Sequence, residues 1–207
     1  MKTLLIILLS LTTACTPHKV KDTLLESTFK LDNKGNPLKH KKLPITFYID
    51  SSVPKDKIAA FKQTADDLNK SLGVRAVNIS LEKVTDETFE THSDVNQIFW
   101  ITTKKDTLSP GEEAKTQLYW TDYESIVNSD IDFNSFQFEG FKDYDLGTLI
   151  RHEMMHSLGF CHVNDNTDIM NPTLGKHEVR LFVSSDQYEA FHKVYDIHAT
   201  ALSQNKK

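Results

Sequence analysis

Three histidines and a glutamate lie close together between residues 152 and 162, which read HEMMHSLGFCH. Two histidines four residues apart on a helix lie on one face, one turn apart, so His152 and His156 can reach the same metal ion. Glu153 is one residue further along and is better placed to contact a water molecule beside the metal than to bind the metal itself. This spacing predicts a metal site with an adjacent carboxylate.

Gly159 stands just past the expected end of this helix, where a glycine can turn the chain sharply. The turn would return His162 as a third ligand. Three nitrogen ligands leave the fourth tetrahedral position of zinc open, as in catalytic sites and unlike closed structural sites. We therefore predict one catalytic Zn²⁺ ion bound by His152, His156 and His162, with Glu153 as the general base. Histidines that only pack or cover the helix are the alternative, which the combined spacing disfavours.

The extended motif resembles the metzincin zinc endopeptidases, and within them the matrixin branch. Residues 168–172, which read DIMNP, resemble the Met-turn of that family, whose methionine forms an apolar floor beneath the zinc ligands. Met170 takes that role in the resemblance, which covers roughly residues 43–198. It implies an α+β, metzincin-like fold with a twisted, mostly parallel five-stranded sheet and an antiparallel edge strand. Two long helices and a small C-terminal subdomain after the zinc-binding motif complete the expected fold.

Several positions depart from the matrixin pattern. Val163 stands where a serine usually follows the third histidine, and Asn171 replaces a common tyrosine. Vertebrate matrixins hold a second, structural zinc, but residues 103–115 contain no histidine and the similar pattern at residues 92–94 lies before the relevant strand. One zinc ion is therefore expected. A structural Ca²⁺ ion is neither supported nor excluded by the sequence. In vertebrate matrixins a cysteine of the pro-domain blocks the zinc. Residues 16–42 contain no cysteine, so we expect no such blocking residue in this segment.

The resemblance also implies a substrate that binds as an extended peptide along an edge strand. The five residues expected to line this cleft are Gln117, Leu118, Tyr119, Trp120 and Thr121. Thr173 and Leu174, just beyond the Met-turn, are expected to border the pocket for a substrate side chain. The predicted function is a zinc-dependent endopeptidase that hydrolyses extended polypeptides outside the cytoplasm. The alternative is a catalytically inactive, zinc-bearing lipoprotein that binds a partner, although a purely structural site has no use for Glu153.

The elements that must position these residues follow from hydrophobic periodicity and capping signals. Alternating or compact apolar runs predict strands at residues 43–49, 77–81, 98–101, 117–121 and 131–134. Helical spacing predicts helices at residues 54–72, 145–157 and 185–198. Asp145 is the expected N-cap of the helix that carries the motif. Ser184 and Gln187 form a capping box for the last helix.

The N-terminus reads as an export signal rather than as part of the fold. A lysine, a short apolar run and small residues precede Cys15, as in a secretory signal peptide. The segment resembles a bacterial lipobox, which implies cleavage before Cys15 and a lipid on its sulfur. Ordinary cleavage after Ala14 is the alternative. The predicted domains are a signal peptide (1–14), a lipidated N-terminus with a basic tether (15–42) and a matrixin-like catalytic domain (43–207).

Charge and composition limit the partners. The 207 residues are 39% hydrophobic, which suits one domain with a sizeable core. Residues 15–42 carry seven lysines against three acidic residues, whereas residues 43–207 carry 16 basic and 26 acidic residues. A basic leader on an acidic body does not indicate a nucleic-acid partner. We expect a peptide or protein substrate, a monomer, and membrane contact through the lipid.

The expected location is outside the cytoplasm. The protein would be anchored to a bacterial membrane, with its catalytic domain in the periplasm or at the cell surface. Thr16 rather than an aspartate after the lipidated cysteine favours the outer membrane. A secreted soluble protein is the alternative. Cys161, the second of two cysteines, is expected to pack as a small apolar residue beside the metal.

Overall fold

The computed structural model describes residues 23–82, 95–102, 108–109, 111–121, 125–136, 145–175 and 177–197. Its elements in chain order are α1 (Thr23–Thr28), β1 (Lys39–His40), β2 (Ile45–Ile49), α2 (Ile58–Leu72), β3 (Val77–Ser80), β4 (Asn96–Trp100), β5 (Ala114–Trp120), β6 (Ser125–Phe133), α3 (Leu146–Ser157) and α4 (Ser185–Val194). None of the helices in these ranges is long and apolar enough to cross a membrane.

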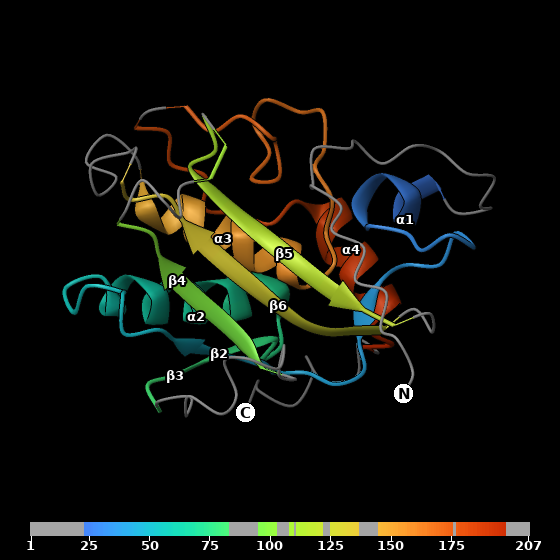
Figure 1. Cartoon of the computed structure of the whole chain (residues 1–207). Helices are drawn as coiled ribbons and strands as arrows, with labels where there is room; N and C mark the ends of the chain where they lie inside the picture. Colours follow the sequence, from blue (N-terminus) through green and yellow to red (C-terminus); the bar gives the residue numbers. More distant parts are fainter. Residues whose placement is uncertain are drawn as a thin grey trace, which may run out of the picture.

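The strands form one six-stranded sheet, five of them in the order β1-β6-β4-β2-β3. The sixth strand, β5, lies outside this order and pairs with β6. β5 runs antiparallel to β6, as the two opposed arrows in Figure 1 show, and the other pairs are parallel. The prediction of an α+β fold with a mostly parallel sheet and an antiparallel edge strand is confirmed. The sheet has one strand more than predicted because β1 pairs with Ser125 and Ile126.

The two long helices α2 and α3 pack against one face of the sheet (Figure 1). Inward-facing side chains of β2, β4 and β6 meet them there, and Phe61 of α2 contacts Phe133 of β6 edge to face, with ring centroids 5.3 Å apart. Phe47, Phe61, Ile98, Ile131 and Phe133 are all completely buried. Burying a side chain of this size stabilises the fold by roughly 1.5–3 kcal/mol, so this layer fixes the position of α3.

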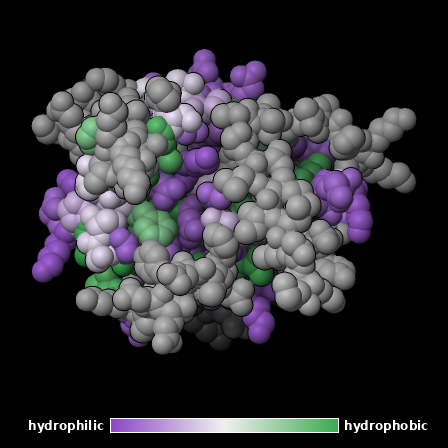
Figure 2. Space-filling view, viewed as in Figure 1, coloured by the Kyte–Doolittle hydropathy of each residue, from purple (hydrophilic) through white to green (hydrophobic). Residues whose placement is uncertain are grey.

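The opposite face of β5 and β6 is polar. Asp130 and Asp132 of β6 project there, and burial raises their pKa to about 7 and about 6, respectively. Tyr119 of β5 shares a hydrogen bond with Asp130, and Lys115 lies close enough to Asp132 to offset part of its shift. Figure 2 views the molecule from the same side as Figure 1 and shows hydrophilic and hydrophobic residues intermixed among those that are coloured.

Capping fixes where α3 and α4 begin. The carboxylate of Asp145 accepts a hydrogen bond of 2.6 Å from the backbone N–H of Thr148. Ser184 and Gln187 form both hydrogen bonds of a capping box. Both expectations from the sequence are confirmed, because a polar side chain at these positions binds N–H groups that the helix itself cannot use. α4 ends at Val194, earlier than expected.

The segment before residue 43 is part of the fold over its described length. Phe29 and Leu38 are completely buried, and the ring of Phe29 packs on Phe160 with centroids 4.5 Å apart. The backbone N–H of Lys30 donates to the carbonyl of Gly159 at 2.8 Å. The sequence predicts that residues 15–42 form a tether, but from Thr23 onward the structure shows this segment packed into the folded domain. The predicted signal peptide and Cys15 lie outside the described residues.

Candidate active site

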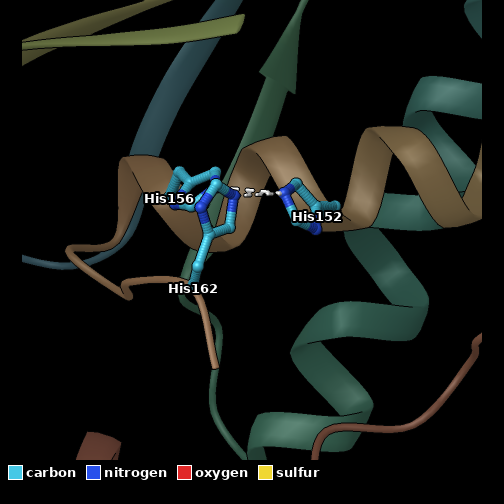
Figure 3. A group of neighbouring side chains, drawn as sticks. All are labelled: His152, His156 and His162. Carbon is cyan, nitrogen blue, oxygen red and sulfur yellow. Dashed lines mark hydrogen bonds between the residues drawn. The ribbon is translucent and has the colours of Figure 1, made fainter. Parts of the chain in front are cut away.

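The three histidines of the motif converge at one point. His152 and His156 project from successive turns of α3, and His162 approaches from the loop that follows, as Figure 3 shows. The Nε2 atom of His156 lies 3.0 Å from that of His152 and 3.0 Å from that of His162, and the third distance is 3.2 Å. The structure thus brings together the three side chains predicted to bind one ion.

Backbone carbonyls orient two of these rings. Nδ1 of His152 lies 2.6 Å from the carbonyl oxygen of Ile169, and Nδ1 of His156 lies 2.9 Å from that of Phe160. Because a carbonyl only accepts hydrogen bonds, each Nδ1 carries the hydrogen and each Nε2 presents a lone pair to the centre. Lone pairs this close repel unless a cation lies between them.

The donor set fits zinc. With Zn–N bonds of about 2.0–2.1 Å and tetrahedral angles, ligand nitrogens stand about 3.3 Å apart, close to the 3.0–3.2 Å found here. Burial lowers the pKa of His152 to about 4 and also lowers the pKa of His156 and His162. All three imidazoles are therefore neutral at pH 7, as metal binding requires.

The turn that returns His162 depends on Gly159. Its φ of +97° lies in the region that L side chains rarely adopt, and a Cβ there would be 2.2 Å from the carbonyl oxygen of Leu38. Beyond this turn the N–H of Cys161 donates to the carbonyl of Thr28 at 2.9 Å. Cys161 is buried, as expected from the sequence. The N-terminal segment therefore braces the loop that carries the third histidine.

The predicted Met-turn contacts this loop. Met170 is completely buried in the main hydrophobic core, and its carbonyl accepts a 3.0 Å hydrogen bond from the N–H of Val163, next to His162. The carboxylate of Asp168 accepts the N–H of Met170 at 2.7 Å and an amide hydrogen of Gln187 at 2.7 Å. The turn also supplies the carbonyl of Ile169 that orients His152.

Glu153 lies beside the histidines and is 4% exposed. Burial raises its pKa to about 7, and the negative charges of Glu113, Asp132 and Glu112 add to the rise. A hydrogen bond of 2.6 Å from the hydroxyl of Thr116 opposes it. A divalent cation bound next to Glu153 would lower this pKa again, because it stabilises the carboxylate.

Thr116 was not predicted from the sequence. It lies in β5 and is 1% exposed. A signal was present in the sequence, because Thr116 lies two residues before Leu118 and therefore on the same, inward face of the strand. A polar residue at an inward position of an edge strand often has a buried partner.

A cavity of about 240 Å³ opens beside the four motif residues. Its lining includes Leu149, Pro172 and Leu174 together with residues 111–116. Leu174, which was expected to border the pocket, is among its lining residues, whereas Thr173 is not. The apolar side chains give this cavity a surface suited to a side chain of a ligand.

The five residues expected to line the cleft have different surroundings. Leu118 is buried at 6% exposure, and Gln117 and Tyr119 alternate with it toward the outer face of the sheet. Trp120 lies under the ammonium group of Lys30, which is 5.0 Å from the ring centroid. The N–H of Thr121 donates to the carbonyl of Ser125. None of the five lines the cavity beside the histidines, although β5 pairs with no described strand but β6.

The family model described as matrixin matches residues 24–196. The match begins within α1 and ends just after α4, so it includes the N-terminal segment that braces the metal-binding loop. A search of curated proteins finds no match.

Proposed function

Because this chain belongs to the matrixin family of metallopeptidases, we propose that it is a zinc-dependent endopeptidase acting on extended polypeptides outside the cytoplasm. The observation that carries the proposal is the convergence of three imidazoles at 3.0–3.2 Å, with the buried carboxyl group of Glu153 beside them. His152, His156 and His162 would hold the ion. When bound there, zinc supplies Lewis acidity toward the peptide carbonyl and toward water.

Glu153 is the general base of the proposed reaction. Its carboxylate accepts a proton from the water molecule that attacks the peptide carbonyl, and it then delivers this proton to the nitrogen of the leaving amine. Its place on the cavity wall supports this role, because substrate and water would meet there. Its burial excludes bulk water, which would otherwise exchange protons with it.

The open edge of β5 supports binding of an extended substrate. A peptide added alongside this strand would form backbone hydrogen bonds that depend little on sequence. Leu149, Pro172 and Leu174 would contact one of its side chains in the cavity. Preference among substrates would then come from this cavity, and affinity from the backbone pairing.

Hydrolysis of an unfolded protein tests the proposal. We expect the purified chain to cleave casein, to lose this activity with a chelator and to recover it with added zinc. Glu153→Gln should retain zinc and lower kcat by about two to four orders of magnitude, the usual range for loss of a general base. Glu189→Gln, an exposed change on α4, is the matched control.

Two outcomes would contradict the proposal. Cleavage that persists in the Glu153→Gln variant would remove Glu153 from the mechanism. A chain that binds one zinc ion but cleaves no substrate would favour the alternative of an inactive zinc-bearing lipoprotein. Mapping new peptide ends produced by the wild type and by Glu153→Gln in a whole proteome would identify the substrates.

A further inference from the structure

We propose that Thr116 is a positioning residue that holds the carboxyl group of Glu153 in place before and after proton transfer. The inference rests on the proposed peptidase function, since it gives Glu153 a partner for each of its two protonation states. Thr116 and Glu153 are 37 residues apart in the sequence and meet because β5 packs directly against α3.

The hydroxyl group of Thr116 lies between two oxygen atoms of Glu153. Its Oγ1 is 2.6 Å from the carboxyl Oε2 and 3.0 Å from the backbone carbonyl oxygen. The backbone carbonyl also accepts a hydrogen bond of 3.2 Å from the hydroxyl of Ser157. Thr116 is 1% exposed and Glu153 is 4% exposed, so water does not replace these contacts.

A hydroxyl group has one hydrogen to donate and two lone pairs to accept. When Glu153 is ionised, Thr116 donates its hydrogen to Oε2. The proton taken from water adds to Oε1, because Oε2 is occupied by Thr116, and Oε2 of the neutral carboxyl still accepts the hydrogen of Thr116. Thr116 neither gains nor loses a proton, and all the heavy atoms stay where they are.

This arrangement explains how the buried carboxyl group of Glu153 can gain and lose a proton without moving. A carboxyl that loses its partner in one of the two states would rotate to find another and leave the position from which it contacts water. Fixed dipoles that need no rearrangement during a reaction are a principal means of lowering its barrier. The hydroxyl of Thr116 therefore keeps Glu153 aligned through both proton transfers.

The test compares two substitutions of the same residue. Thr116→Val keeps the shape of the side chain and removes the hydroxyl, whereas Thr116→Ser keeps the hydroxyl. A hydrogen bond to a charged group contributes enough that its loss should lower kcat by about ten- to a hundred-fold, with KM and one bound zinc unchanged. Thr116→Ser should restore kcat to within about three-fold of the wild type, since it keeps the donor.

Thr64→Val is the matched control, because Thr64 is a buried threonine of α2 at 5% exposure. It should leave kcat unchanged. Introducing Thr116→Val into the Glu153→Gln variant should cause no further loss of activity, since the effect of Thr116 passes through Glu153.

A wild-type kcat in Thr116→Val overturns the inference. Equal losses in the Val and Ser variants that follow their melting temperatures also overturn it, because they would assign Thr116 to stability alone. The proposed peptidase function is tested separately by the wild type, whose failure to cleave casein would refute that function whatever Thr116 does.

Discussion

The α-carbon of Gly159 faces the backbone carbonyl of Leu38 so closely that an added Cβ would lie 2.2 Å from the oxygen. The contact joins the N-terminal segment to the turn between the second and third histidines. The neighbouring hydrogen bond from Lys30 to Gly159 fixes the same two segments. The position of His162 therefore depends on residues more than a hundred positions earlier in the chain.

Gly159→Ala should destabilise the protein by at least about 2 kcal/mol, because it adds a backbone clash to an unfavourable φ. Gly111→Ala is the control, since Gly111 has a φ of +90° but no atom within 4 Å of an added Cβ. It should cost only about 1 kcal/mol. Urea denaturation measures both values, and equal losses would show that the contact with Leu38 is unimportant.

Removing one histidine should remove the metal. His162→Ala should fall well below one zinc per chain, whereas His177→Asn, an exposed change at a φ of 59°, should bind zinc normally. Zinc binding to the folded chain alone raises its stability by about 2.7 kcal/mol at a hundred times Kd. The melting temperature should therefore rise with zinc in the wild type and not in His162→Ala. A zinc-dependent rise in both would place the metal elsewhere.

Leu174 should influence which peptides are cleaved. Its side chain lines the cavity beside the histidines, and that of Thr173 does not. Leu174→Phe reduces the space for a substrate side chain and should shift the preference on the primed side toward smaller residues. Thr173→Val should leave the preference unchanged. Cleavage of a peptide library measures the preference of both variants. An unchanged cleavage profile in Leu174→Phe would show that Leu174 does not contact the substrate side chain.

His40 should make the protein less stable in acid. Burial lowers its pKa from 6.5 to about 4, and its Nε2 donates to the carbonyl of Ser157 at 2.8 Å. The unfolded chain therefore binds a proton at His40 more readily than the folded chain does. This contribution to stability is complete above pH 6.5 and is lost as the pH falls toward 4.

His40→Gln keeps a donor for the carbonyl but does not titrate. The stability difference between wild type and variant should change by on the order of 3 kcal/mol between neutral pH and pH 4. Denaturation curves at a series of pH values measure it. Parallel pH dependences in the two proteins would show that His40 is not responsible.

Cys15 should carry a lipid in the exported protein. The sequence contains only two cysteines, so a disulfide within the chain could join Cys161 only to Cys15 and would exclude acylation of the Cys15 sulfur. We expect membrane-bound protein whose mass includes the lipid, and release of the Cys15→Ser variant into the soluble fraction. An unmodified chain whose mobility changes on reduction would favour the disulfide instead.

The sequence predicts best what is local. The spacing of His152 and His156 and the caps at Asp145 and Ser184 depend on neighbours within one or two turns, and the structure has all of them. The strand expected at residues 131–134 runs instead from Ser125 to Phe133. The sequence did not predict its first part because Asn128 and Ser129 are polar, although both are buried. Their partners lie elsewhere in the chain: Asn96 of β4 accepts from Ser129, and the carbonyl of Val95 accepts from Asn128.

Long-range contacts account for the other differences. Phe29 and Leu38 belong to a segment rich in lysine, asparagine and aspartate, and only their contacts with the turn after α3 show why they are buried. Thr116 likewise gains its importance from Glu153, which belongs to another element. The alternation along β5 marks Thr116 as an inward-facing residue, but it does not identify Glu153 as its partner.

The start of α1 at Thr23 limits how far an anchored enzyme could act from a lipid bilayer. With an anchor at Cys15, only residues 15–22 would separate the bilayer from the folded domain. Eight extended residues span at most about 28 Å, whereas residues 15–42 as a free tether would span about 100 Å. An anchored form would thus cut polypeptides that pass close to the bilayer, and distant ones would have to diffuse to it.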